Sequence, residues 1–407
     1  MKLEISGFEQ ARENIKPFVS PTPLIRNEWL SKKFNCNMYL KLENLQPVGS
    51  FKLRGATNFM SQMTDEEKQM GVLAVSAGNH AQGVAWAAEK FGVEATIIMP
   101  TSSPLTKIAN TEALGAKVIL KGDNVDESFE FAKEYLQENK KVYIHPFNHE
   151  NVIYGQGTIA YELKDQLPNI DYIFGSIGGG GLMAGIGMVA KTLFDKCTIV
   201  GSQSTGAASM IKSLQQGKLI EMETVATFAD GIKVRKPLIN MYEILDELID
   251  EAIHVPDDKV SKSLLELIEH ARIITEGAGA INLAAFEELF DRNPRRFKAK
   301  NVVLVICGGN IDINLIDRII DIGLVESKRR AKMKVILEDK PGGLKLLTDI
   351  LSDASANVLQ VYHLRDEPSI QLNQSIVEVI METKGSTHTE EIFSAVKEKF
   401  HIIPWGA

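Results

Sequence analysis

Short β-branched runs alternate with longer amphipathic stretches along most of this chain, from about Met38 to Ile306. This alternation is typical of strands joined by crossover helices, and it predicts an α/β fold. Most runs lack a polar–apolar alternation, so we expect strands buried on both faces, as in a parallel sheet. The predicted strands are Met38–Leu42, Val72–Val75, Ala95–Met99, Lys117–Leu120, Tyr172–Gly175, Thr198–Gly201 and Val302–Ile306. Helical periodicity lies between them, at Ala81–Phe91, Val125–Gln137, Ile153–Gln166 and Ser261–Ala271.

Three glycine-containing segments lie where predicted strands end and predicted helices begin. They are Ser76–Asn79, Gly178–Gly181 and Cys307–Asn310. Open α/β sheets bind ligands beyond the carboxyl ends of their strands, because the loops there meet at a common crevice. We therefore expect the three segments to line one cleft.

Composition narrows the classes of function. The chain has 407 residues, 44% of them hydrophobic, which is enough for two or three domains with substantial buried cores. The net charge of −8 is spread along the sequence rather than gathered into a basic patch, so nucleic acid is not an expected partner. The three cysteines show no C-x-x-C spacing, which argues against a disulfide framework or a zinc site. No stretch has the character of a signal peptide or a membrane span, and we expect a cytoplasmic protein.

The character of the sequence changes around Glu326–Lys334, where a basic polar stretch ends the α/β pattern. We place a domain boundary there and predict a catalytic domain at 1–325 and a small domain at 326–407. The small domain is expected to follow a βαββαβ order, the ferredoxin-like motif. Its predicted elements are a strand at Met333–Leu337, a helix ending at Leu351, strands at Val358–Leu364 and Ser375–Glu382, a helix at Thr389–Phe400 and a short final strand.

Lys52 stands among small and apolar neighbours at a predicted helix start, in the segment Ser50–Ala56. Such surroundings depress the pKa of a lysine, and the neutral amine is the form that makes a Schiff base or acts as a base. A solvated lysine on an amphipathic helix is the alternative interpretation, because most lysines are exposed.

Four consecutive glycines, Gly178, Gly179, Gly180 and Gly181, precede Leu182 and a predicted helix. Their backbone N–H groups can converge on an anion without obstruction by side chains, and the helix N-terminus adds a partial positive charge. The segment has no P-loop lysine, so nucleotide binding is not indicated. A flexible hinge is the alternative.

The order of these motifs resembles that of the tryptophan-synthase-β class of pyridoxal-phosphate enzymes, fold type II. The matching pieces are Lys52, Ser76–His80, the four glycines, Thr275–Gly279 and Cys307–Asn310. Within that class, the motifs SFKLRGA, SAGNHAQG and GGGGL resemble threonine and serine dehydratases. The resemblance implies a tryptophan-synthase-β-like α/β fold and pyridoxal 5'-phosphate as the cofactor.

The resemblance also implies a role for each matching residue. Lys52 would hold the cofactor as a Schiff base and then remove the substrate's Cα proton, and Phe51 would pack against the ring. Asn79 would hydrogen-bond the ring's 3-oxygen. The substrate carboxylate would bind the amides of Ser76, Ala77, Gly78, Asn79 and His80. The cofactor phosphate, whose acid form would protonate the leaving hydroxyl, would bind Gly178, Gly179, Gly180, Gly181 and Leu182.

Two further residues match positions near the cofactor. Cys307 stands where the family places a neutral hydrogen-bond partner of the pyridine nitrogen, and Glu276 matches an acidic position. By residue type alone, Cys307 also suits a packed core thiol and Glu276 a solvated helix start. Asn79 and His80 likewise suit ordinary helix caps.

Differences within the family help to choose the reaction. Similar serine racemases carry a serine at the position of Ala77, as the acid/base on the second face of the substrate, so its absence favours elimination. They also bind a divalent ion through acidic residues in the segment that matches Gly201–Met210, which has none here, and we expect no metal site. The implied enzyme is a threonine ammonia-lyase that converts L-threonine to 2-oxobutanoate and ammonia, with L-serine as a secondary substrate. A serine-preferring dehydratase and a non-catalytic amino-acid sensor are the alternatives.

The segment from about Lys332 onward resembles a single ACT-type regulatory domain, with Asp339–Leu344 at the turn where such domains often bind an amino-acid effector. A structural or oligomerisation module is the alternative. Isoleucine or valine would be expected to control a biosynthetic enzyme of isoleucine formation, and a nucleotide such as AMP, or no effector, a catabolic one. The resemblance also implies a homodimer or homotetramer under allosteric control.

Overall fold

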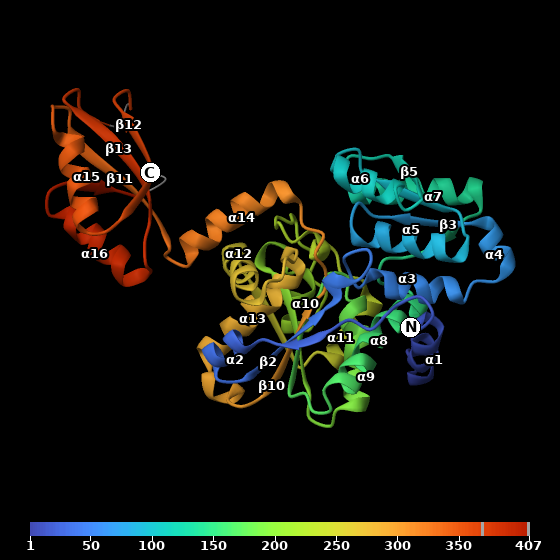
Figure 1. Ribbon diagram of the computed structural model, residues 1–407. Helices are drawn as coiled ribbons and strands as arrows, with labels where there is room; N and C mark the ends of the chain where they lie inside the picture. Colours follow the sequence, from blue (N-terminus) through green and yellow to red (C-terminus); the bar gives the residue numbers. More distant parts are fainter. Residues whose placement is uncertain (368–369, 405–407) are drawn as a thin grey trace. The chain divides into compact units, whose positions relative to one another are not determined.

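The computed structural model describes residues 1–367 and 370–404. It divides the chain into two compact units, Met1–Asp312 and Ile313–Ala407 (Figure 1). Helix α14 (Ile313–Glu326) therefore belongs to the second unit, and the predicted domain boundary at residue 325/326 lies at the end of this helix. Among the described residues, no helix combines the length and apolarity needed to cross a bilayer.

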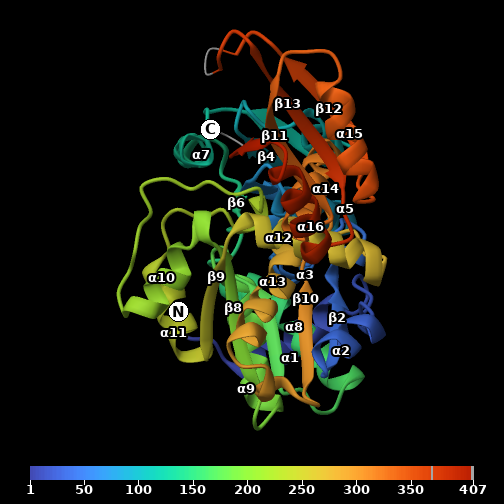
Figure 2. The same ribbon diagram turned by 90° about the vertical axis from the view of Figure 1, so that its left-hand side faces the viewer.

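The first unit contains two sheets, both of which are almost entirely parallel. The six-stranded sheet has the order β1-β2-β10-β7-β8-β9, and only β1 runs antiparallel to its neighbour (Figure 2). Its strands are β1 (Leu24–Arg26), β2 (Asn37–Leu42), β7 (Tyr172–Ser176), β8 (Thr198–Ser204), β9 (Glu251–Val255) and β10 (Asn301–Ile306). The four-stranded sheet has the order β5-β4-β3-β6 and is wholly parallel. Its strands are β3 (Val72–Val75), β4 (Ala95–Met99), β5 (Lys117–Leu120) and β6 (Val142–Tyr143).

The α/β fold predicted from the sequence is confirmed. All seven predicted strands are present, and every residue of β3 and β4 is buried, as expected for strands covered on both faces. The sequence analysis did not identify β1, β6 or β9.

Helices cover both sheets and lie between successive strands. They are α1 (Ile5–Ile15), α2 (Glu28–Phe34), α3 (Lys52–Ser61), α4 (Asp65–Met70), α5 (Asn79–Phe91), α6 (Leu105–Glu112), α7 (Val125–Asn139), α8 (Glu150–Gln166), α9 (Gly181–Leu193), α10 (Ser209–Gln216), α11 (Ile239–Leu248), α12 (Asp257–Glu266) and α13 (Gly277–Arg292). Short 3-10 turns form η1 (Glu43–Leu45), η2 (Thr205–Ala207), η3 (Asp230–Ile232) and η5 (Pro294–Phe297). Local sequence sets several ends: Thr64 and Glu67 form a capping box at α4, and Gly92, at φ +64°, ends α5. The predicted helix at Ser261–Ala271 is α12 followed by a π-helical turn at Leu267–Ala271.

The second unit contains an antiparallel sheet of order β12-β13-β11-β14. The elements are β11 (Arg330–Glu338), α15 (Gly343–Asp353), β12 (Asn357–Leu364), β13 (Gln374–Glu382), α16 (Ser386–Lys397) and β14 (His401–Ile403). This is the predicted βαββαβ order. Burial alternates along β11, where the buried residues are Ala331, Met333, Val335 and Leu337. They form one core with Leu347 and Leu351 of α15 and Ile392 and Val396 of α16, so both helices cover the same face of the sheet.

Candidate active site

Lys52 is the first residue of α3 and lies beside the end of β10. The segment before it pairs with the segment after β10: Ser50 and Gly308 form an antiparallel bridge, and the N–H of Phe51 donates to the carbonyl of Cys307 at 3.1 Å. The amine of Lys52 donates to the carbonyl oxygen of Pro146 at 2.9 Å. The sequence analysis placed Lys52 and Cys307 in one cleft, and the structure brings them together through these main-chain contacts.

The surroundings of Lys52 favour its neutral form. Desolvation by the protein around the amine lowers the pKa of Lys52 to about 8, and nearby Cys307 and Glu276 oppose this shift more weakly. Burial, together with the positive charge of Lys52, also lowers the pKa of His80 to about 3 and that of His145 to about 4. Both imidazoles are therefore neutral at pH 7, and Lys52 is the titrating group among the three.

The segment Ser76–His80 joins the end of β3 to α5. The Ser76 hydroxyl accepts a hydrogen bond from the N–H of Gly78 at 3.1 Å, which shapes the turn, and α5 begins at Asn79. The first amides of a helix have no partner within it, so those of this turn are available to an anion. A Cβ built on Gly83 would lie 3.0 Å from the main chain of Lys52, which shows how closely α5 approaches the start of α3.

The side chains of this segment point in different directions. The imidazole of His80 is buried and contacts the carbonyl of Ile144 through Nε2 at 2.9 Å, so it faces the core. The Asn79 amide instead reaches the six-stranded sheet, where its Nδ2 donates to Oε1 of Glu276 at 2.8 Å. Asn310 completes the cluster by donating from Nδ2 to Oδ1 of Asn79 at 2.8 Å. The motifs that carry Asn79, Glu276 and Asn310 thus meet at one point.

Glu276 is the N-terminal flanking residue of α13. Desolvation raises the pKa of its carboxyl, and the hydrogen bond from Asn79 offsets part of that rise. A Cβ built on Gly308 would lie 2.5 Å from Oε1 of Glu276, so only glycine lets the carboxyl approach so closely. The interpretation of Glu276 as a solvated surface residue does not fit this burial.

Cys307 follows β10 directly, and its side chain is buried. Desolvation raises the pKa of its thiol to about 12, so the group is an uncharged thiol at neutral pH. Its sulfur lies 3.4 Å from the hydroxyl oxygen of Ser176 at the end of β7. The sequence analysis did not single out Ser176, although its place at the end of a parallel strand was a usable signal.

The four glycines join β7 to α9, with Leu182 buried in the first turn of that helix. Gly180 has φ +103°, a conformation that favours glycine. A Cβ built on Gly179 would lie 2.2 Å from the ring of Phe147, the residue after the Pro146 carbonyl that accepts from Lys52. The glycine loop and Lys52 are therefore neighbours through Pro146 and Phe147. Sequence reasoning missed this pair, although the pair follows β6 at the edge of the sheet where β3 ends.

These features suit a phosphorylated aldehyde. A lysine amine with a lowered pKa can condense with a carbonyl group, and a loop of four glycines before a helix N-terminus can bind a phosphate through backbone N–H groups. The neutral Cys307 thiol can act as a hydrogen-bond partner without bringing a charge. The residues present thus fit pyridoxal phosphate. Within residues 1–367 and 370–404, no three His, Cys, Asp or Glu side chains are grouped so that they could hold a metal ion.

This chain is similar in sequence and in fold to proteins that are already known. The profile of the family described as pyridoxal-phosphate dependent enzyme matches residues 15–308. An L-threonine ammonia-lyase of Thermotoga maritima is 41% identical over 390 residues, which cover 96% of each chain. Among solved structures, threonine deaminase isoform 2 of Solanum lycopersicum has a TM-score of 0.73 at 36% identity, covering 78% of this chain and 94% of its own. Maize serine racemase has a TM-score of 0.75 at 30% identity, covering 78% of this chain and 97% of its own. With this likeness and a site that fits the cofactor, the chain belongs to the family of pyridoxal-phosphate-dependent enzymes.

Proposed function

We propose that this enzyme is a threonine ammonia-lyase, which converts L-threonine to 2-oxobutanoate and ammonia by loss of the β-hydroxyl as water and later addition of water. The observation that carries the proposal is the similarity to an L-threonine ammonia-lyase over nearly the whole chain. The lowered pKa of Lys52 supports it, because an uncharged base is needed at the reacting carbon and a lower pKa leaves more of the amine uncharged.

Each predicted site residue takes a role in this proposal. Bound pyridoxal phosphate supplies an electron-withdrawing ring, which makes the Cα–H of an attached amino acid acidic. Lys52 would bind the cofactor and afterwards accept the Cα proton at Nζ. Phe51 would pack against the ring and Asn79 would donate to its 3-oxygen, while Glu276 holds Asn79 through their hydrogen bond. Cys307, an uncharged thiol, would be the partner of the ring nitrogen.

Two groups of backbone amides would hold the anionic ends of cofactor and substrate. The phosphate would be bound by Gly178, Gly179, Gly180, Gly181 and Leu182, at the N-terminus of α9. The substrate carboxylate would be bound by Ser76, Ala77, Gly78, Asn79 and His80, at the N-terminus of α5. This arrangement places the carboxylate on the four-stranded side of the cleft and the phosphate on the six-stranded side.

Ala77 supports elimination over racemisation. Its methyl group can neither donate nor accept a proton, so this position offers no acid on the second face of the substrate. A Cα proton removed by Lys52 is then not replaced from the opposite side, and loss of the β-hydroxyl is the expected course. We keep L-serine as a secondary substrate, because one methyl group in a pocket is worth only about 1–3 kcal/mol.

The activity is tested with the purified holoenzyme. With L-threonine we expect 2-oxobutanoate and ammonia in equal amounts, and with L-serine pyruvate at a lower kcat/KM. A higher kcat/KM for serine would replace the proposal with a serine-preferring dehydratase. No turnover of either amino acid by cofactor-loaded protein would favour the non-catalytic sensor.

We also propose that the second unit is an ACT-type regulatory domain, with an amino-acid effector bound at Asp339–Leu344. This turn joins β11 to α15; Gly342 has φ +94°, and Asp339 accepts a hydrogen bond from Nε of Arg365 at 3.0 Å. The first amides of α15 are available there, as at any helix N-terminus. Isoleucine or valine as the effector would place the enzyme in isoleucine biosynthesis, and AMP would indicate a catabolic role.

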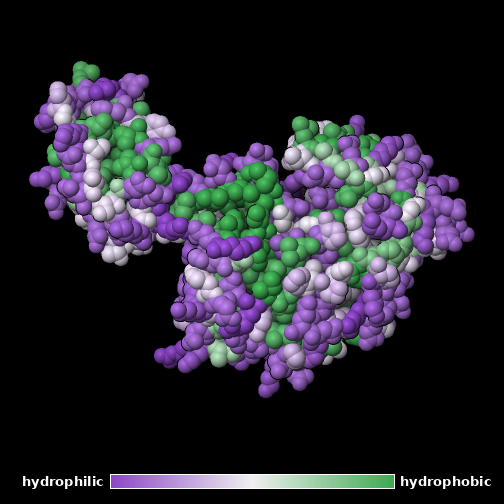
Figure 3. Space-filling model, viewed as in Figure 1, coloured by the Kyte–Doolittle hydropathy of each residue, from purple (hydrophilic) through white to green (hydrophobic). Residues whose placement is uncertain are grey.

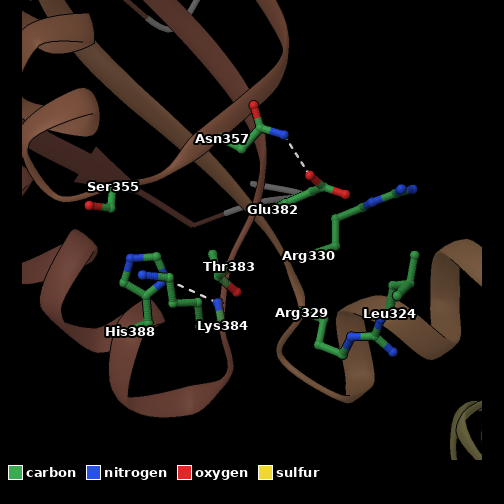
Figure 4. A pocket seen from close by; sticks show the side chains of 9 residues that line it. All are labelled: Leu324, Arg329, Arg330, Ser355, Asn357, Glu382, Thr383, Lys384 and His388. Carbon is green, nitrogen blue, oxygen red and sulfur yellow. Dashed lines mark hydrogen bonds between the residues drawn. The ribbon is translucent and has the colours of Figure 1, made fainter.

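A cavity in this unit, away from the predicted effector turn, provides the control for the effector experiment. It is a cavity of about 300 Å³ between the start of β11, the start of β12 and the start of α16 (Figure 4). Its lining includes Lys384 and His388, whose Nδ1 accepts a hydrogen bond from the Lys384 N–H at 3.0 Å. The predicted effector turn follows the opposite end of β11.

The effector proposal predicts which substitution abolishes the response. Threonine turnover is titrated with isoleucine, valine and AMP in the parent enzyme, in Gly343→Val and in Lys384→Ala. We expect one amino acid to shift the threonine KM or kcat, and Gly343→Val alone to abolish the shift, because its side chain would cover the amides of the turn. Loss of the response in Lys384→Ala instead would move the effector to the cavity, and a flat response in the parent enzyme would rule out regulation by these ligands.

We further propose a homodimer or homotetramer. Helix α14 exposes Ile313 and Ile322, and Figure 3 shows hydrophobic residues gathered over this helix. The edge strand β12 exposes Leu359, Val361 and Tyr362. Apolar groups exposed in this way are typical of surfaces that a second copy covers.

A further inference from the structure

One ion pair joins the two sides of the proposed site, the four-stranded and the six-stranded. Lys107 lies in α6, on the four-stranded side, and Asp230 begins η3, on the six-stranded side. Nζ of Lys107 donates to Oδ2 of Asp230 at 2.9 Å. The Lys107 side chain is only 18% exposed, although most of α6 faces solvent, and Asp230 is 61% exposed. We call this contact the rim ion pair.

The Asp230 end of the rim ion pair is part of the cofactor wall. The next residue, Gly231, packs against the glycine loop, because a Cβ built on Gly178 would lie 3.0 Å from its carbonyl oxygen. A Cβ on Gly231 itself would lie 3.1 Å from Oε1 of Glu276. Through Gly231, Asp230 therefore adjoins two parts of the proposed site, the glycine loop and Glu276.

The Lys107 end is attached to the proposed substrate loop. Helix α6 follows β4, which pairs with β3 along its length, and the Ser76 N–H donates to the carbonyl of Ile98 in β4 at 3.1 Å. If α6 and the four-stranded sheet move together, the Ser76–His80 segment must therefore move with them (Figure 1). Inside the cleft, the hydrogen bonds of Asn79 to Glu276 and Asn310 join the same two sides.

We propose that Lys107 and Asp230 are positioning residues that hold the Ser76–His80 segment at the distance from the cofactor wall at which an amino-acid substrate is bound. The inference rests on the proposed deaminase function, since it assigns the substrate carboxylate to that segment. The charges of Lys107 and Asp230 both influence the pKa of Glu276, so the pair lies close to the proposed reacting groups. Neither residue touches the reacting atoms in this proposal; both act through the loops they carry.

A kinetic signature separates positioning from a merely structural role. An ion pair with one exposed partner contributes little to folding, so Lys107→Met and Asp230→Asn are expected to fold and to keep the visible absorption of the bound cofactor. The threonine KM should rise about fivefold in each, from a contact worth up to roughly 1 kcal/mol, while kcat stays within about twofold. The double exchange Lys107→Asp with Asp230→Lys should return KM toward the parent value. Lys133→Met, which removes the exposed pair of Lys133 with Glu130 on α7 of the same side, is the matched control and should leave KM unchanged.

Hydrogen exchange of the holoenzyme tests the rim ion pair without reference to catalysis. Amides of α6 and of residues 76–80 should exchange faster in Lys107→Met than in the parent protein and in Lys133→Met. A parent protein that turns over no amino acid contradicts the proposed function, and the exchange rates still decide whether the ion pair holds the loop. Unchanged exchange in Lys107→Met, or an unchanged KM in an active enzyme, would overturn the inference. If KM rises in the single variants and stays raised in the double exchange, the inference is also overturned.

Discussion

Replacing Lys52 with alanine is expected to lower kcat for threonine by roughly 10³-fold or more, because it removes both the amine that binds the cofactor and the base at Cα. The variant should also lack the visible absorption of lysine-bound cofactor, and borohydride should no longer attach the cofactor to the protein. Steady-state rates, absorption spectra and mass spectrometry of reduced peptides measure these effects. The expected loss is large because one side chain serves two steps.

The matched control for this substitution is Lys90→Ala, which removes an exposed lysine from the last turn of α5, at the end remote from Ser76–His80. Its kcat should stay within about twofold of the parent value, because a surface substitution of this kind costs little. A Lys52→Ala variant that kept substantial turnover, or that was still labelled by borohydride at another lysine, would show that Lys52 is not the cofactor lysine.

The pKa of Lys52 adds a pH dependence to this result. Only the neutral amine attacks an aldehyde, so the rate at which apoprotein captures pyridoxal phosphate should rise through pH 8 and level off above it. A lysine with the ordinary pKa of 10.5 would instead continue to gain rate well beyond that range. Stopped-flow absorbance from pH 6 to about 10 would distinguish the two curves.

Replacing Arg54 with leucine is expected to lower the free energy of unfolding by about 3–5 kcal/mol, because it leaves the buried Glu43 carboxylate without its ion-pair partner and takes one of two cations from Glu162. Arg54 is fully buried in α3, two residues after Lys52. It donates from Nε and Nη2 to Glu43, at 2.7 and 2.8 Å, and from Nη1 to Glu162 at 2.6 Å. Burial alone would raise the pKa of Glu43, but the adjacent Arg54 lowers it overall, so the charged form of Glu43 depends on this cation.

Urea denaturation of the holoenzyme measures this loss, with Lys16→Met as the control. Lys16 pairs with Glu13 at 3.5 Å on the exposed side of the N-terminal region, and its removal should change the unfolding free energy by less than about 1 kcal/mol. A change of similar size in both variants would show that the buried network contributes no more than a surface pair. Loss of stability confined to Arg54→Leu would show that buried ion pairs hold α3, and with it Lys52, in position.

Three of the predicted strands share a physical property, whereas the predicted strand β5 is exposed or half-buried at a sheet edge. β3, β4 and β10 are continuous apolar runs because both of their faces are covered, and such runs are visible without any knowledge of their neighbours. The three strands that the sequence analysis missed lack this property. β1 and β6 contain only three and two residues, and β9 is only partly buried. Their conformation depends on pairing with β2, β3 and β8, which are remote in sequence.

The residues of the candidate site also divide into those that the sequence predicted and those that only the tertiary structure revealed. Glycine loops after apolar strands mark the edge at which a ligand binds, and this rule grouped Ser76–Asn79, Gly178–Gly181 and Cys307–Asn310 in advance, whereas Lys52 was added by the family resemblance. Pro146 and Phe147 carry no comparable local pattern, and Ser176 offered only its place at the end of a strand. Their part in the site comes from contacts with residues remote in sequence, such as the hydrogen bond between Lys52 and Pro146.

The amino-acid sequence by itself determined the order of strands and helices, the βαββαβ pattern of the second unit and the chemical types of the site residues, because these are set by neighbours within a few positions. Only the tertiary structure decided the partners of these residues and the size of their pKa shifts: the hydrogen bond of Lys52 to Pro146, the pKa of Lys52 near 8 and the contact of Cys307 with Ser176. Desolvation and Coulomb interactions depend on which groups are close in space, and folding brings those groups together from distant parts of the chain.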